Sequence, residues 1–282
     1  GGMLRSLPIG ESVRGGGKPP HRVRQRFNFI HSIVEAKVSA ATNVIPSYDI
    51  VPSTSDPQDW NAAQLSEKVA IYGYDKWNLR RASTELVTNA LVQREGFAYP
   101  YWDANVGPFI ETLNDEGEVE TLGTGEVKVK ILGADQVFWE PGVNFEESRW
   151  HAIETAMYIG DVYDLPDYNG GPLKPDAATA DNPTERESDE LVLVTEYLER
   201  PSLKNPKGQR IFMGNNKVLC QPKSFPLTDP DKKPVDEPCL IRLSYVVDPT
   251  QDRDRGLVEL LIDPQRTIND AWNKIIEWKN RC

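Results

Sequence analysis

The stretch EVKVKILG, residues 126–133, indicates the fold class because its side chains alternate with a period of two. Val127, Val129 and Ile131 fall on one face, and two lysines fall on the other. This pattern is typical of a half-buried β-strand, whose successive side chains point to opposite faces of a sheet. We therefore predict a strand here, with its apolar face towards a core.

Further strands are expected downstream of this one. Residues 190–200, ELVLVTEYLER, are more continuously apolar and predict a better buried strand. Residues 209–219 predict a hairpin that turns at Gly214 to Asn216, and residues 239–247 predict another strand. Residues 150–166 read as a strand that runs into one short helical turn, with Asp161 as its cap. A hairpin turn is predicted at 114–117, and a surface loop poor in large apolar residues at 172–190.

Helices are expected on both sides of these strands. Apolar residues at steps of three and four predict helices over 27–44, 57–73, 77–94 and 264–281. Asp56–Pro57 and Asp263–Pro264 each combine an N-cap residue with a proline at the first helical position, where the missing N–H costs nothing. The predicted fold is therefore α+β, with long helices flanking antiparallel strands between 97 and 247.

Charge is distributed unevenly along the chain. Residues 1–26 carry six basic side chains and one acid, which gives +5, so the total of -11 leaves -16 for residues 27–282. We divide the chain into a flexible basic arm (1–26), an α+β body (27–262) and a closing helix (263–282). Arg22, Arg24 and Arg26 are candidate contacts to a polyanion, and a solvated glycine-rich tail is the open alternative. The acidic body disfavours stable binding of nucleic acid or of an anionic membrane.

Residues with obvious chemistry form no clear pattern in the sequence. Three cysteines are widely spaced without a C-x-x-C, which fits a reducing compartment, and no apolar run is long enough for a membrane span. No cofactor, metal or catalytic role is predicted. The alternative is a metal-dependent hydrolase or nuclease that uses the acidic loops within 229–263, but these loops lack the spacing of a calcium-binding EF-hand and are predicted to be solvated turns.

Several segments, taken in order, resemble the wing region of the portal proteins of tailed bacteriophages. They include RFNFIHSIVEAKVSAATNVIPSYDIVP at 26–52, WNLRRASTELVTNALVQREGFAYPYWDANVG at 77–107 and RGLVELLIDPQRTINDAWNKIIEW at 255–278. Between them, 127–165 and 194–219 resemble the strands of that region. The resemblance covers most of residues 22–281.

This resemblance implies a structural role. Similar proteins form closed rings of about twelve copies at one capsid vertex, where they act as head-to-tail connector and as conduit for DNA packaging and ejection. It implies contacts with the terminase motor, the capsid and head–tail adaptor proteins, passage of double-stranded DNA without reading its sequence, and a place in the virion after assembly in the host cytoplasm. Portal proteins continue into a stem and clip, so the closing helix is expected to lead towards a stem beyond this chain.

Two tryptophans of the closing helix are the candidate subunit contacts. Trp272 and Trp278 lie in a helical pattern that also carries Ile268 and Ile275, and large aromatic side chains are favoured anchors of protein interfaces. A carbohydrate- or protein-binding tail module is a further alternative, which the long helices fit poorly because such modules tend to be all-β.

The charge division predicts opposite behaviour of arm and body towards DNA. The whole chain should bind a random duplex weakly and in a salt-sensitive way, with a dissociation constant of roughly 10⁻⁴ to 10⁻⁶ M. Deleting residues 1–26 should abolish this binding, because it removes the +5 segment. Fluorescence anisotropy at low and moderate salt measures both chains. Nanomolar binding by the deleted chain would contradict the prediction.

Overall fold

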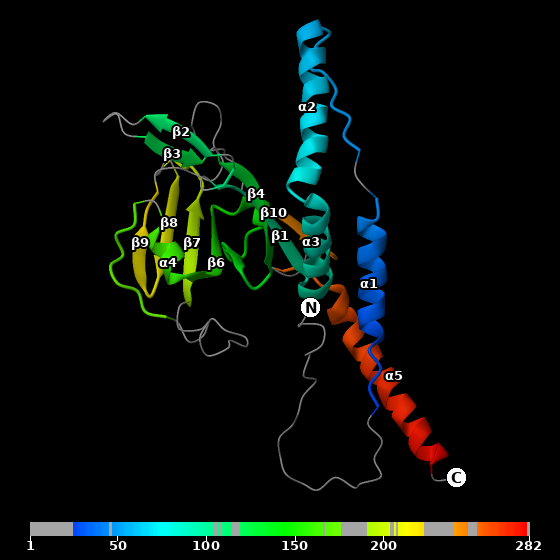
Figure 1. The fold of residues 1–282 in the computed structure, drawn as a ribbon. Helices are drawn as coiled ribbons and strands as arrows, with labels where there is room; N and C mark the ends of the chain where they lie inside the picture. Colours follow the sequence, from blue (N-terminus) through cyan, green and yellow to red (C-terminus); the bar gives the residue numbers. More distant parts are fainter. Residues whose placement is uncertain are drawn as a thin grey trace.

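The computed structural model describes residues 25–44, 47–103, 106–107, 109–113, 119–123, 125–165, 167–175, 191–203, 206, 208–222, 240–247 and 253–280. Its long helices gather on one side and its strands on the other (Figure 1). The long helices are α1 (Phe29–Thr42), α2 (Pro57–Lys76), α3 (Leu79–Gln93) and α5 (Leu257–Lys279). The predicted α+β class is therefore confirmed.

The strands form three antiparallel sheets. The first has the order β10 (Ile241–Ser244), β1 (Glu95–Asp103), β4 (Glu126–Gly133), and the second is the pair β2 (Phe109–Leu113) and β3 (Val119–Gly123). The third runs β5 (Val137–Trp139), β6 (Trp150–Tyr158), β7 (Leu191–Glu199), β8 (Gln209–Gly214), β9 (Lys217–Cys220). Two short helices, η1 (Phe145–Glu147) and α4 (Ile159–Tyr163), flank β6. The predicted turn at 114–117 and most of the predicted loop at 172–190 lie outside the described residues.

Two strand predictions had different outcomes. Strand β7 is central in its sheet, as a well-buried strand should be, but its burial alternates: Val192, Val194 and Leu198 are buried on one face, whereas Leu193 on the other face is 39% exposed. In β4, the lysine face is covered only in part: Lys128 is 41% exposed in its side chain and pairs with Asp103 of β1. Lys130 donates from Nζ to Thr155 Oγ1 of β6 at 3.1 Å, and burial lowers the pKa of this lysine. The five-stranded sheet therefore covers this face of β4 at Lys130.

Turn and cap chemistry explains two boundaries. Asn215 and Asn216 join β8 to β9 with φ angles of 49° and 60°, the left-handed backbone that a two-residue hairpin turn requires and that asparagine tolerates. Asp56 caps α2 by accepting from the N–H of Gln58, and Pro57 occupies the first turn. Both predictions from the sequence are confirmed.

The predicted start of the last helix is wrong. Helix α5 begins at Leu257, so Pro264 lies inside it and Asp263 is not its cap. Leu257 and Val258 are buried against Ile30 and Leu91, and this packing extends the helix upstream. Likewise, Asp161 lies within the first turn of α4, where Tyr158 is the N-cap residue.

A buried ionic network, comprising Glu95, Arg242, Arg253 and Asp254, joins the helical side to the sheets. Glu95 is fully buried, and its Oε1 accepts from Arg242 Nη2 at 2.9 Å and from the Asp254 backbone N–H at 3.1 Å. Arg242 Nη2 also donates to Asp254 Oδ2 at 2.8 Å. Arg253 donates to the carbonyl oxygens of Ala134, just after β4, and of Val137, the first residue of β5. The network thus ties together segments that are far apart in the sequence.

Replacing Arg242 with alanine should lower the free energy of unfolding by about 3–5 kcal/mol, because it removes the cation hydrogen-bonded to the buried Glu95 carboxylate and leaves only Arg253, 3.9 Å away. The matched control is Arg149→Ala, which breaks an ion pair with Glu140 at an exposed position and should change stability little. Denaturant titration followed by tryptophan fluorescence measures both variants. Equal losses in the two variants would contradict the role given to the network.

Candidate subunit interface

Helix α5 has three faces with different environments. Its first turn is buried in the helical core through Leu257 and Val258. A second face carries three amide side chains at four-residue steps: Gln265, Asn269 and Asn273. The third face leaves Ile268, Trp272, Ile275 and Trp278 in solvent.

The amide face binds an extended segment from the other end of the chain, Gln25–Phe29. Asn273 accepts from the N–H of Gln25 at 2.9 Å and donates to its carbonyl oxygen at 3.1 Å. Asn269 makes the same pair of bonds with Phe27, at 3.0 and 3.3 Å. Gln265 donates to the carbonyl of Phe27 at 2.7 Å and accepts from the N–H of Phe29 at 2.9 Å. We call these three side chains the amide ladder.

Simple geometry explains why the ladder fits. Four residues of an α-helix rise about 6.0 Å, and two residues of an extended chain span about 6.6 Å, so every second residue of the segment meets every fourth residue of α5. Each amide can donate and accept at once, as one residue of extended backbone does. The bonds involve only the backbone of the segment.

The ladder holds aromatic rings beside the exposed face of α5. The ring of Phe27 lies 5.9 Å from that of Trp272 and 6.1 Å from that of Phe29, between centroids. All three side chains are more than a third exposed, and Trp272 is 45% exposed. Trp278, nearer the end of α5, is 70% exposed. We call the exposed rings Phe27, Phe29, Trp272 and Trp278 the aromatic patch; the ring contacts join Phe27 to Phe29 and to Trp272, and Trp278 lies further along α5.

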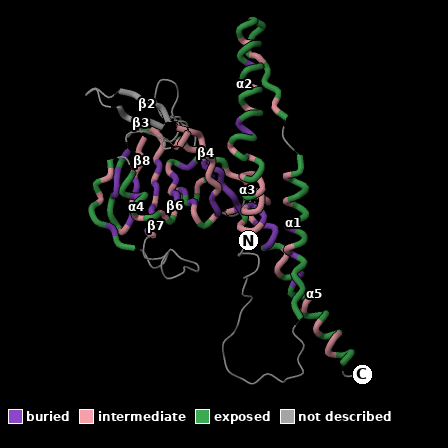
Figure 2. Tube along the Cα trace, in the orientation of Figure 1, coloured by how far each residue is buried: buried purple, intermediate pink, exposed green. Residues whose placement is uncertain are grey.

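A second apolar surface lies on α2, which extends away from the sheets at the opposite end from the tip of α5 (Figure 1). Leu65, Val69 and Tyr72 follow one another at steps of four and three, and each is more than half exposed. Trp60 and Ile71 are also exposed on this helix. Figure 2 shows exposed residues along most of the length of α2 and along the end of α5.

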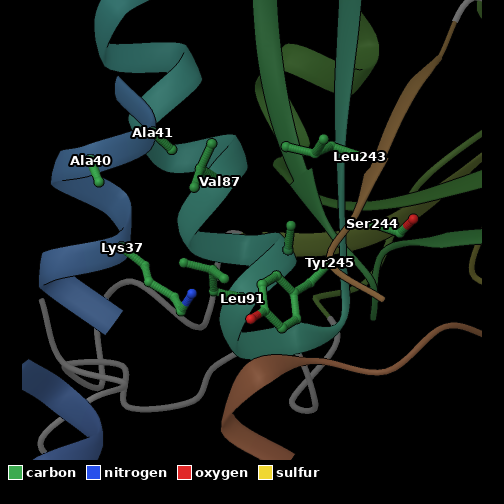
Figure 3. Close-up of a pocket in the computed structure, with 9 residues that line it drawn as sticks. Lys37, Ala40, Ala41, Val87, Leu91, Leu243, Ser244 and Tyr245 are labelled. Carbon is green, nitrogen blue, oxygen red and sulfur yellow. The ribbon is translucent and has the colours of Figure 1, made fainter. Parts of the chain in front are cut away.

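A pocket of about 480 Å³ lies between α1, α3 and the end of β10 (Figure 3). Its walls are mostly apolar and include Ala41, Val87, Leu91 and Leu243. Lys37 lies at one side with its Nζ 5.7 Å from the centroid of the Tyr245 ring, a cation–π contact. The pocket separates α1 from the sheet and leaves α1 held mainly by its contacts with α3 and α5.

Of the predicted contact residues, Trp272, Trp278 and Arg26 are exposed, and the other two lie outside the described residues. Trp272 and Trp278 are exposed on α5, as an interface requires, and the structure adds Phe27 and Phe29 beside them. Arg26 is exposed within the segment bound by the ladder, whereas Arg22 and Arg24 lie outside the described residues.

The acidic loops give no metal site where they can be examined. Residues 229–233 and 248–252 lie outside the described part of the chain. Asp254 is buried in the ionic network, and Asp263 is exposed beside Arg266. Among the described residues, no group of three or more histidine, cysteine, aspartate or glutamate side chains could hold a metal ion.

The pattern Gln265, Asn269, Asn273 is visible in the sequence but does not by itself predict a contact. Amides at four-residue steps are also ordinary surface residues, so the spacing shows only that one helix face can bond an extended chain. The partner segment, more than two hundred residues away, carries no complementary signal in its side chains because only its backbone is bound.

Removing the ladder should release residues 25–27. In the double variant Asn269→Ala, Asn273→Ala, the amide hydrogens of Gln25 and Phe27 should exchange roughly tenfold faster, since each lost bond contributes about 0.5–1.5 kcal/mol. The control Asp270→Ala alters the same turn of α5 outside the ladder. Hydrogen exchange read by NMR or mass spectrometry measures the effect, and unchanged exchange in the double variant would contradict it.

No helix in the described ranges is long and apolar enough to cross a membrane. The chain matches no protein-family model and no curated protein.

Proposed function

We propose that this chain is a structural subunit of a closed ring, of the kind that forms the portal at a tailed-phage capsid vertex. The observation that carries the proposal is the pair of exposed apolar surfaces, the aromatic patch on α5 and the Leu65–Val69–Tyr72 stripe on α2. Monomeric proteins rarely expose contiguous apolar patches of this kind, and larger ones mark interaction sites.

A ring built from one kind of subunit needs head-to-tail contacts. In such a contact each copy presents two different surfaces, and the ring closes when the rotation between copies closes. The apolar surfaces of α2 and α5 are different and lie on helices that extend in opposite directions (Figure 1). One chain therefore offers the two surfaces that head-to-tail assembly requires.

The charge of the chain suits a conduit for DNA. Residues 27–282 carry -16 in total, and an acidic wall repels phosphates instead of holding them, which lets a duplex slide. In this role the chain catalyses no reaction, and a separate terminase motor supplies the work of packaging. Contacts with the motor, the capsid and adaptor proteins, and a place in the virion, belong to the same proposal and rest on the resemblance of the sequence.

A metal-dependent hydrolase gains no support from the described acids, because Asp254 is already paired with Arg242.

The full-length protein, in which this chain continues into its stem, should form rings in solution, visible as a discrete high-mass species by mass photometry and as rings in negative-stain images. The double variant Trp272→Ala, Trp278→Ala should weaken this assembly strongly, because a buried aromatic anchor contributes roughly 2 kcal/mol or more to an interface. The matched control is Trp102→Ala, which removes an exposed tryptophan of β1. Monomers alone at every concentration would reject the ring, and equal loss in the control would reject the aromatic patch as the contact.

A further inference from the structure

We propose that residues 25–42, the ladder-bound segment together with α1, cross to the neighbouring subunit in the ring and bind the α5 and α3 of that second copy. We call residues 25–42 the arm-helix unit. This inference rests on the proposed ring, since it needs a second copy held close by.

The arm-helix unit binds a surface that is separate from its own attachment point. The amide ladder on α5 holds its extended part through the backbone. Ile30 and Val34 then enter the core formed by Leu91, Leu257 and Val258. Lys37 contacts the ring of Tyr245. These partners lie on α3, on α5 and after β10, and an identical set exists on every copy of the chain.

The connection from α1 to α2 is long and exposed. It comprises residues 43–56, of which 45 and 46 lie outside the described residues. Figure 1 shows its described part from residue 47 onwards running beside α2 before the chain turns back into that helix. Val44 is 75% exposed and Val51 76% exposed. The hydrogen bonds of Ser53 and Thr54 go to Asp59 in the first turn of α2, at the far end of the connector.

A connector of this length can reach another subunit. Fourteen extended residues span up to about 46 Å, which is more than the width of a small domain. Exchange of the unit preserves every contact described above, because the neighbour presents the same ladder and the same core. In an isolated chain the connector favours binding within the chain through an effective concentration in the millimolar range. In a ring, a neighbouring α5 is held at a comparable concentration.

Exchange also adds buried contacts to the apolar surfaces of α2 and α5, because an exchanged unit places Ile30 and Val34 in the core of the next copy. Crossing also places the connector between two subunits, where Val44 and Val51 gain apolar neighbours instead of water.

A cysteine pair tests the exchange. Gln25→Cys and Asn273→Cys are introduced together into the full chain, with Cys239→Ser and Cys282→Ser to remove other thiols; Cys220 is buried. Unlabelled subunits and subunits labelled with ¹⁵N are mixed before assembly, the rings are isolated and oxidised, and the cross-linked peptides are identified by mass spectrometry. The two single-cysteine variants are the controls. A second pair, Phe27→Cys with Asn269→Cys, repeats the test if the first pair impairs folding.

With exchange, roughly half of the cross-linked pairs from an equal mixture join a labelled and an unlabelled peptide, because neighbours are drawn at random. Rings in which every cross-link joins two peptides of the same isotope overturn the exchange and leave the ring standing. A chain that forms no rings overturns the ring and the exchange together.

Discussion

The arrangement of the whole molecule depends on the buried carboxylate of Glu95. It follows Arg94, whose φ of 85° is a strained backbone angle that ends α3 and turns the chain into β1. Without a cation, a carboxylate in this position would cost several kcal/mol, so Arg242 of β10 must lie against it. Arg242 in turn fixes Asp254, and Arg253 lies over the Trp139 ring at 4.5 Å. This one buried carboxylate thereby fixes the positions of α3, β1, β10, β5 and the start of α5 relative to one another.

Local sequence rules predicted where a helix begins when no tertiary packing acted on that end of the helix. Asp56–Pro57 starts α2 because that end of the helix is exposed and only its own cap decides where it begins. The same pair of residue types at Asp263–Pro264 failed, because burial of Leu257 and Val258 stabilises two further turns upstream. The proline costs the helix one hydrogen bond, but Leu260, whose carbonyl loses its partner, is exposed and can be hydrated.

The candidate interface could be predicted only in part. A helical pattern of Ile268, Trp272 and Ile275 indicated one apolar face of α5, but no pattern shows whether such a face is core or surface, since both have the same period. The structure leaves this face in solvent. Phe27 and Phe29 could not be assigned to it from the sequence because the segment that carries them reaches α5 through backbone bonds. The closed ring and the portal-like role stay predictions.

The ladder also determines how α5 can move. If the extended segment shifted by two residues towards the end of the helix, Phe27 and Phe29 would bond to Asn273 and Asn269, but Gln265, only 7% exposed, would lose its partners. The shift would also withdraw Ile30 and Val34 from the core that holds them. The loss of the Gln265 bonds and the loss of core packing would both destabilise the shifted arrangement. Residues 25–34 and α5 therefore form one rigid unit with a single register. An exchanged arm would therefore bind the α5 of the adjacent copy in this single register, while the connector over residues 43–56 ties it to its own α2.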